Sequence, residues 1–289
     1  MHRNSSLNFR NLYIVFICVI CLLSGILFSS FFLIGNPDTV LGGLLARTDR
    51  TDKTPDDVTP VTDTVQLEQL QAEVDKYTQI MSSPYLIVVN SEKPLPEDYE
   101  KPNLNELSAN PSMELDEVAA TQIERFFADA QAAGYKYVIT GAYRTAAAQT
   151  EAYNTALQAN LRAGYTTAEA EALASKSVAK AGESEYQTGL IISFTENRSM
   201  TAEEFMQTDF YKYVSENIHK YGFVQRYPTN KEAITGYSPS PFVYRYVGDV
   251  ESATYIHQNG LSIEEYNDYI SQQKAFAEQR LSSLKSGNS

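Results

Sequence analysis

An uncharged, almost wholly apolar run from Leu12 to Ile34 sets the first limit on how this chain can fold. As a helix rising ~1.5 Å per residue, the run would be about 34 Å long, enough to cross a hydrocarbon core of ~30 Å. Arg3 and Arg10 precede it, and positive residues favour the cytoplasmic side of a membrane. The pattern predicts a single-pass anchor in the cell membrane, with residues 1–11 in the cytoplasm, 12–34 across the bilayer and the rest outside.

A cleaved signal peptide is the alternative for the same run. Signal peptides have an apolar region of about 7–15 residues followed closely by a site of small residues. The run here is longer, and no clean site of that kind follows it. Ile20, rather than a small residue, precedes Cys21, which argues against a lipoprotein anchor. The sequence therefore favours an uncleaved anchor.

Charge and composition narrow the classes of function. The chain of 289 residues carries 23 Lys and Arg against 36 Asp and Glu, a net charge of −13. We expect no nucleic acid partner, because nucleic acids call for basic patches. Both cysteines, Cys18 and Cys21, lie in the apolar run, which excludes a disulfide framework or a cysteine-based zinc site elsewhere. The three histidines, His2, His219 and His257, leave few ligands for a transition metal.

Two segments separate the anchor from the main domain. Residues 35–63 are polar and lack hydrophobic periodicity, which predicts a disordered linker. Residues 64–82 predict an amphipathic stalk helix, because apolar residues recur at alternating spacings of three and four. Two heptads are too few for a coiled coil, so docking onto the domain or a short stalk is favoured over dimerisation.

Local signals predict mixed helices and strands after residue 84. Tyr85–Asn90 is a short apolar run that predicts a strand, as does Lys136–Thr140. Residues 116–133 have a wide apolar helical face, and Asp116 is its candidate N-cap. Other helices are expected from Ala146 onward with a break at Gly164 and a cap at Thr166 or Thr167, over Thr201–Lys220, and over Ala253–Asn259, with a frayed tail after Leu281.

The stretch Gly182–Thr195 carries the strongest resemblance to a known family. It resembles the zinc-site segment of the VanY-type D-alanyl-D-alanine carboxypeptidases, whose pattern is S-x-H-x-x-G-x-A-x-D. Ser184 and Gly189 fit this pattern. Tyr186 stands where the family has its zinc-binding His, and Ser193 stands where it has its zinc-binding Asp.

Three later blocks extend the resemblance. Tyr221–Pro228 matches Y-G-F-x-x-R-Y-P, and Lys231–Tyr237 matches K-E-x-I-T-G-Y. Ser240–Gly248 is similar to E-P-W-H-Y-R-Y-V-G, in which the Glu is the general base and the His is the third zinc ligand. Ser240 and Val243 stand at these two positions. The resemblance therefore implies a metallopeptidase family whose metal-site positions are all substituted here.

The resemblance covers residues 84–270 and implies an α+β fold, with a small, mostly antiparallel sheet packed by helices. Residues 271–289 would form the end of a C-terminal helix and a tail. Gly141–Thr145 is similar to the family's S-G-Y-R-S segment. Arg144 is the counterpart of the Arg that faces the bound peptide in that family.

The substitutions remove the chemistry of a zinc site. Catalytic zinc needs about three ligands drawn from His, Asp, Glu or Cys. Val243 cannot coordinate a metal, and the hydroxyls of Tyr186 and Ser193 are weak ligands unless they ionise. With Ser240 in place of the general base as well, we expect no catalytic residue, no metal site and no cofactor.

Substitute groups are scarce. His219 and His257 fit a capping or surface role near a helix C-terminus. Glu183 and Glu185 could bind a hard cation weakly, but a short carboxylate pair in a loop is expected to be solvated. The serines at positions 184, 193 and 240 lack an expected His neighbour to activate them.

We therefore predict a pseudoenzyme that binds a peptidoglycan stem peptide or another envelope protein. The cleft would be lined by Arg144, Ser184, Tyr186 and Gln187. One alternative is an active peptidoglycan D-alanyl-D-alanine carboxypeptidase with a relocated metal site. A second is a structural or regulatory protein whose cleft is vestigial and which acts through residues 64–82.

Overall fold

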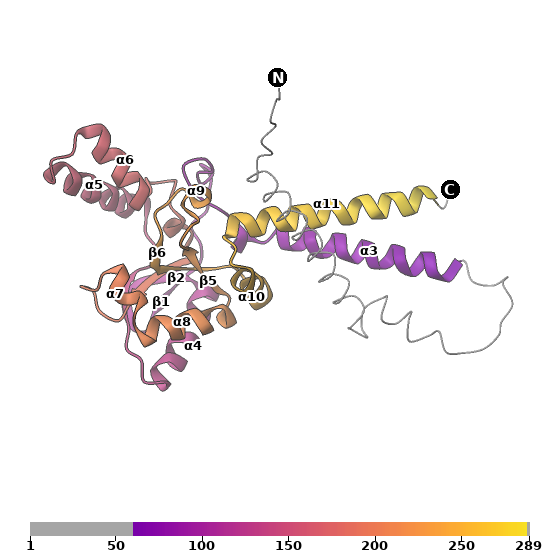
Figure 1. The fold of residues 1–289 in the computed structure, drawn as a ribbon, viewed down its shortest axis with the longest axis horizontal. Coiled ribbons are helices and arrows are strands. Elements are labelled where there is room, and N and C mark those ends of the chain that lie inside the picture. The colour runs from indigo at the N-terminus through magenta and orange to yellow at the C-terminus, as the bar shows by residue number, and fades with distance from the viewer. Residues whose placement is uncertain (1–59, 288–289) are drawn as a thin grey trace, which may run out of the picture. The chain divides into compact units, whose positions relative to one another are not determined.

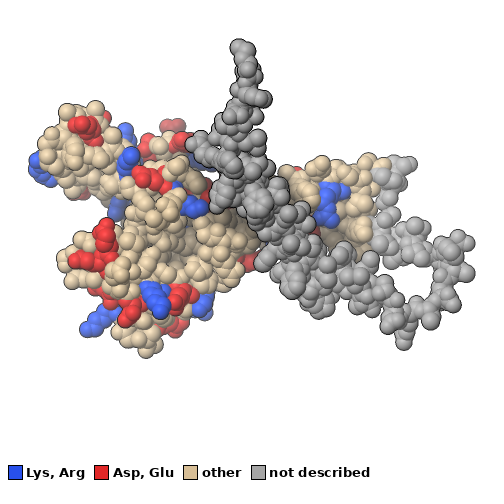
Figure 2. Space-filling view, viewed as in Figure 1, with Lys and Arg blue, Asp and Glu red and all other residues tan. Residues whose placement is uncertain are grey.

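The computed structural model describes residues 60–287 of the chain (Figure 1). The predicted cytoplasmic segment 1–11, the predicted anchor 12–34 and nearly all of the predicted linker 35–63 lie outside the described residues. Within residues 60–287, no helix combines the length and the apolar character needed to cross a bilayer. On the face shown in Figure 2, acidic and basic side chains are interspersed.

The centre of the fold is a four-stranded antiparallel sheet with the strand order β3-β4-β6-β5 (Figure 1). Its strands are β3 (Val138–Gly141), β4 (Ile191–Thr195), β5 (Phe223–Tyr227) and β6 (Ser240–Tyr246). Every residue of β4 is buried, as expected for a strand paired on both sides. The predicted α+β class with a small antiparallel sheet is confirmed.

A second, two-stranded sheet was not expected from the sequence. β1 (Leu104–Leu107) pairs antiparallel with β2 (Asn110–Asp116), and β2 leads directly into α4 (Glu117–Ala132). The carboxylate of Asp116 accepts the backbone N–H groups of Val118 at 3.0 Å and Ala119 at 3.2 Å. This N-cap satisfies donors that the first helical turn leaves free, and it confirms the predicted start of the helix.

Aromatic rings join α4 to the central sheet. Phe126 and Phe127 of α4 contact Phe194 of β4, with ring centroids 6.2 and 5.1 Å apart. Phe194 also stacks on Tyr244 of β6 at 4.7 Å. These four rings are buried in one continuous core, so the sheet has one well-packed face that holds the strands in place.

The prediction of one continuous helix over Thr201–Lys220 is wrong. The segment forms α7 (Ala202–Met206), α8 (Asp209–Asn217) and the 3-10 helix η3 (Ile218–Tyr221). Thr201 and Thr208 each accept a backbone N–H at the start of a helix, so α7 and α8 begin separately. N-cap side chains favour helix starts, and here two caps seven residues apart divide one apolar pattern.

The predicted break at Gly164 is confirmed. α5 (Ala146–Arg162) ends just before Gly164, whose φ of +94° is rarely open to other residues. α6 (Thr167–Ser177) begins with a capping box, in which the side chains of Thr166 and Glu169 each accept the other's backbone N–H. The two helices form a hairpin beside the sheet (Figure 1).

The helix pair consists of α3 (Pro60–Met81) and α11 (Ile263–Gly287), which lie side by side (Figure 1). The contact is apolar and joins Leu70, Val74, Ala277 and Leu281. The expected fraying after Leu281 is wrong, because Leu281 is buried and Leu284 packs beside it as the helix continues. α9 (Glu232–Thr235) and α10 (Val250–Asn259) complete the described helices.

The strand predicted over Tyr85–Asn90 is also wrong. Pro84–Leu86 forms a short 3-10 helix, η1, and the residues that follow pair with no strand. The carbonyls of Tyr85 and Ile87 instead accept hydrogen bonds from the Arg245 guanidinium at 2.8 and 3.0 Å. A side chain therefore satisfies the backbone groups that a neighbouring strand would otherwise satisfy.

Candidate functional site

A pocket of about 150 Å³ collects most of the residues that the sequence singled out. It lies where the 3-10 helix η2 (Glu185–Thr188), β6, the start of α5 and the end of α6 meet. Its lining comprises Arg144, Gln149, Lys176, Ser177, Val178, Ala179, Ser184, Tyr186, Tyr227, Tyr237, Ser238, Ser240 and Val243. Two cations and many hydroxyls line this pocket, and none of its lining residues is acidic.

Ser193 and Val243 lie directly opposite each other on β4 and β6. Ser193 also lies opposite Gly141 of β3. The Ser193 hydroxyl accepts from Thr140 Oγ1 at 3.1 Å and donates to the Gly141 carbonyl at 3.4 Å. Both Ser193 and Val243 are buried, so this part of the site is filled and hydrogen-bonded by the protein itself.

Tyr186 lies in η2, and its side chain extends to Ser193. Its hydroxyl hydrogen-bonds Ser193, and its ring lies beneath Arg144, with Arg144 Cζ 4.1 Å from the ring centroid. Burial raises the pKa of the Tyr186 phenol, and the opposing effects of Arg144 and Ser193 do not reverse this. Tyr186 therefore remains a neutral phenol at physiological pH.

Arg144 is held at the pocket by three contacts. Its backbone N–H donates to the Tyr186 carbonyl at 3.0 Å, and its Nη1 donates to Gln149 Oε1 at 3.2 Å. Gln149 is buried and its amide in turn donates to the Ala179 carbonyl at 2.7 Å. With the cation–π contact to Tyr186, this arrangement orients the guanidinium before any ligand arrives.

Of the other residues predicted to line the cleft, one lines the pocket and one does not. Ser184 does line the pocket, where its hydroxyl accepts the Tyr186 N–H at 3.3 Å and caps η2. Gln187 does not line it, because its side-chain oxygen accepts the Gly182 N–H at 2.6 Å. Ser240 lies at the partly exposed edge of the pocket. Arg144, Ser184 and Tyr186 are thus brought together, and Gln187 supports the preceding turn.

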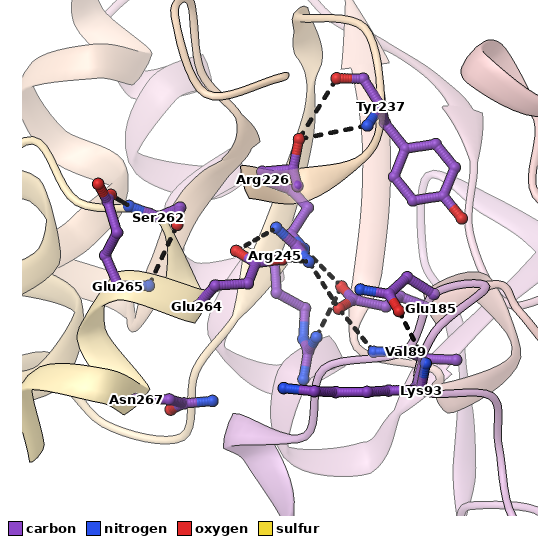
Figure 3. A network of polar contacts seen from close by, with 12 residues as sticks. Val89, Lys93, Glu185, Arg226, Tyr237, Arg245, Ser262, Glu264, Glu265 and Asn267 are labelled. Atoms are coloured by element: carbon purple, nitrogen blue, oxygen red, sulfur yellow. Dashed lines mark hydrogen bonds and ion pairs between the residues drawn. The ribbon is translucent and has the colours of Figure 1, made fainter. Parts of the chain in front are cut away.

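A buried ion network includes the first residue of η2, Glu185. Its other members are Arg226, Arg245 and Glu264 (Figure 3). Glu185 Oε2 lies 2.8 Å from Arg226 Nε and 2.7 Å from Arg245 Nη1. Arg226 Nη2 lies 2.6 Å from Glu264 Oε1. The expectation that Glu185 is solvated is wrong, since its side chain and both arginines are fully buried.

The charges of this network explain how a carboxylate can be buried there. Burial alone would raise the pKa of Glu185, but Arg226 and Arg245 outweigh it and lower that pKa to about 2. Buried charges survive only when paired and hydrogen-bonded, and two carboxylates here match two guanidinium groups. Arg226 and Arg245 each lie within an apolar strand segment of the sequence. An arginine in such a segment indicates a buried acidic partner, and this signal could have predicted the burial of Glu185.

Comparisons with known proteins identify the family to which this fold belongs. The chain matches the family described as VanY, D-alanyl-D-alanine carboxypeptidase, over residues 112–249. It is 35% identical over 183 residues to a D-alanyl-D-alanine carboxypeptidase of Enterococcus faecalis, and the match covers 63% of this chain and 65% of that protein. It is 34% identical over 194 residues to the Bacillus subtilis protein YodJ, covering 64% of this chain and 67% of that protein.

A solved structure, VanYB in complex with D-alanine-D-alanine, superposes with a TM-score of 0.57 at 35% identity. The superposition covers 64% of this chain and 98% of that one. The chain belongs to the VanY family of D-alanyl-D-alanine carboxypeptidases. The matched region spans slightly less than two thirds of the E. faecalis relative.

The VanY family implies a zinc ion, and the residues that the resemblance places at its ligand positions do not fit one. Tyr186 is a neutral phenol, Ser193 is engaged by Thr140 and Gly141, and Val243 has no donor atom. Among residues 60–287, no group of three His, Cys, Asp or Glu side chains could hold a metal ion. The donors that zinc requires are therefore missing at this site.

The two histidines of the described region do not replace these donors. His219 of η3 and His257 of α10 stack on each other with ring centroids 4.2 Å apart. Neither residue lines the pocket. The pocket serines consequently have no imidazole beside them that could activate a hydroxyl as a nucleophile.

Proposed function

We propose that this chain is a membrane-anchored, extracytoplasmic VanY-family pseudoenzyme that binds a cell-wall peptide without hydrolysing it. The observation that carries the proposal is the exchange at the metal position. Tyr186 fills the position of a zinc ligand and at the same time supports Arg144, the residue oriented toward the pocket. Catalytic groups are lost, while a binding group remains in place.

The proposed ligand is a peptide that ends in a free carboxylate, such as the D-alanyl-D-alanine end of a peptidoglycan stem peptide. The related VanYB structure contains D-alanine-D-alanine. Arg144 and Lys176 supply positive charge at the pocket, and none of the lining residues is acidic. Guanidinium–carboxylate hydrogen bonds are among the stronger ones because both partners are charged.

The absence of hydrolysis follows from the side chains at the four family positions. General acid–base catalysis requires a group that exchanges protons near neutral pH. Ser240 stands where the VanY family has its Glu, and its hydroxyl does not titrate in that range. Tyr186 is also unsuited as a base, because its pKa lies above the ordinary value for tyrosine.

A peptide incubation separates this proposal from the active-enzyme alternative. The full-length protein is incubated with a stem peptide ending in D-alanyl-D-alanine, with added zinc, and the products are weighed by mass spectrometry. We expect an unchanged peptide. Loss of the terminal residue that a chelator abolishes would instead support an active carboxypeptidase with a relocated metal site, as the names of the relatives suggest.

A titration tests the binding half of the proposal. Isothermal calorimetry with D-alanyl-D-alanine should show binding that Arg144→Ala weakens by at least tenfold, because a hydrogen bond to a charged group contributes about 2 kcal/mol. Arg162→Ala is the matched control, since Arg162 is exposed at the far end of α5, the helix that follows Arg144. Equal affinity in wild type and Arg144→Ala would contradict the role of Arg144 and favour a partner that binds elsewhere, such as an envelope protein at the helix pair.

A further inference from the structure

The helix pair and the pocket meet at the buried ion network. The segment that follows α3 contributes three backbone groups. Arg245 donates to the carbonyls of Tyr85 and Ile87, and Glu185 Oε1 accepts the Val89 N–H at 3.3 Å. The first turn of α11 contributes Glu264. The segment after α3 and the first turn of α11 are therefore both bonded to the same cluster of charges, to which Val89 and Glu264 belong in Figure 3.

The same cluster holds η2, which carries the pocket residue Tyr186. η2 has only four residues, and a 3-10 helix of that length gains little stability from its own hydrogen bonds. Gly182 and Gly189, on either side of it, have φ of +83° and +72°, conformations that glycine adopts without strain. Its orientation must come from tertiary contacts, and those of Glu185 are charged, buried and short.

The contacts also continue along the helix pair. Asn267 of α11 donates to the Leu86 carbonyl at 2.9 Å. Leu86 and Val88 then pack with Ile263 and Ile270 of α11 in an apolar cluster against which Tyr77 and Ile80 of α3 are packed. A displacement of the helix pair would thus disturb the hydrogen bonds that Arg245 donates to this segment and the one that Glu185 accepts from it.

We propose that Glu185 is a positioning residue that couples the seating of the helix pair to the pocket. When the segment 85–89 and the first turn of α11 are seated, Arg226 and Arg245 hold Glu185, and Glu185 places its neighbour Tyr186 beneath Arg144. When either element moves away from the domain, the two carboxylates and two guanidinium groups no longer neutralise one another. η2 is then no longer held in the orientation that places Tyr186 beneath Arg144. The coupling rests on the proposed function only where ligand affinity is measured.

Coupling of this kind is reciprocal, because a ligand and a seated element that favour one state stabilise each other equally. A peptide in the pocket should therefore protect the segment 85–89 from opening. A loosened helix pair should in turn weaken peptide binding. These two effects would make the pocket responsive to whatever acts on α3 and α11.

The test is hydrogen exchange on the full-length protein, with Glu264→Gln as the variant. Glu264 retains 13% exposure of its side chain, so its neutralisation disturbs the edge of the network and leaves Glu185 to neutralise both arginines. We expect exchange at least tenfold faster in residues 184–190 and 85–89, with β4 and α4 unchanged. Glu203→Gln is the control, because Glu203 is exposed on α7 and belongs to neither the ion network nor the helix pair.

A second variant, Leu70→Ala, loosens the helix pair without touching the ion network, since Leu70 is buried between α3 and α11. It should raise exchange in the same two segments. Faster exchange confined to α3 and α11, or spread evenly over all segments, would overturn the proposal, because both outcomes describe stability without coupling.

The ligand arm uses D-alanyl-D-alanine and calorimetry. Glu264→Gln should raise its Kd at least fivefold, and Glu203→Gln should leave it unchanged. If Glu264→Gln binds as wild type does, the proposed coupling is wrong. If wild type itself does not bind, the proposed function fails, and the exchange experiment still decides whether Glu185 couples η2 to the helix pair.

Discussion

The guanidinium of Arg144 lies over the ring of Tyr186, with Cζ 4.1 Å from the ring centroid. The resemblance to the VanY family places Tyr186 at the position of a zinc ligand, so one residue would both remove a metal donor and support the cation at the pocket. The Tyr186 hydroxyl bonds Ser193, which the resemblance places at a second metal position. The substitutions at 186 and 193 are therefore complementary in structure.

Replacing Tyr186 should separate the contribution of its ring from that of its hydroxyl. Tyr186→Leu removes the cation–π contact, which is worth about 0.5–2 kcal/mol, and should weaken D-alanyl-D-alanine binding several-fold in calorimetry. Tyr186→Phe keeps the ring and loses only the hydrogen bond with Ser193, so its affinity should stay close to that of wild type. Equal losses in the two variants would mean that the ring does not support Arg144.

Gly141 should tolerate no side chain while Ser193 is present. A Cβ at Gly141 would lie 2.7 Å from Ser193 Oγ and 3.4 Å from both Arg144 Nη2 and Tyr186 Cε1. Gly141→Ala should therefore lower the free energy of unfolding by about 1–3 kcal/mol, the usual range for an overpacked site. Urea unfolding measures this effect.

A double variant gives the control. Ser193→Ala removes the atom that the new Cβ would meet, so Gly141→Ala should cost less in that background than in wild type. Residues in contact are expected to show such non-additivity, whereas independent sites add. Strictly additive losses in urea unfolding would mean that the close approach to Ser193 is relieved by other movements.

Local signals in the sequence predicted the local parts of this fold. The cap at Asp116 and the break at Gly164 follow from side-chain hydrogen bonding and a positive φ, which depend on neighbouring residues alone. The pocket residues Arg144, Ser184 and Tyr186 were found through a resemblance that carried their three-dimensional proximity with it. A predictor without that resemblance could not have joined residues so far apart in the chain.

The errors arose where distant residues decide the structure. The run Tyr85–Asn90 has the composition of a strand, but its backbone groups are taken by Arg245, a residue far along the chain. The local sequence predicts that Glu185 is a solvated loop carboxylate, but in the fold it is buried between Arg226 and Arg245. In both cases a buried guanidinium overrides the local tendency, and its position follows only from the folded sheet.

Glu185 should lose its stabilising effect only in strong acid. Its pKa in the folded protein is about 2, against 4.5 for an ordinary glutamate. Because the folded value is the lower one, the contribution is fully present above about pH 4.5 and declines as the pH falls toward 2. A difference of this size corresponds to about 3 kcal/mol of unfolding free energy.

Carbon NMR of glutamate-labelled protein measures this directly. One glutamate side-chain carboxyl should remain ionised at a pH where exposed glutamates have taken up protons, until acid unfolding releases it. Arg226→Lys should raise that pKa, since a lysine cannot supply the two parallel hydrogen bonds that Arg226 makes to Glu185. Titration of every glutamate near the ordinary value would contradict the buried pairing.

Reversing the substitutions should create a zinc site in the existing fold. The triple variant Tyr186→His, Ser193→Asp and Val243→His places three strong donors where Ser193 and Val243 lie opposite each other and Tyr186 meets Ser193. Three such ligands with one open position suit zinc. We expect about one zinc per dialysed triple variant by elemental analysis, none in wild type, and a thermal unfolding midpoint that rises when zinc is added.

Ser240→Glu alone is the control for this experiment, because it adds a carboxylate at the edge of the pocket without the three donors. It should bind no zinc. Failure of the folded triple variant to bind zinc would show that the backbone around β4 and β6 has departed from the VanY geometry as well as the side chains. Binding would mean that the loss of metal resides in these side chains alone, because η2, β4 and β6 still bring the three positions together.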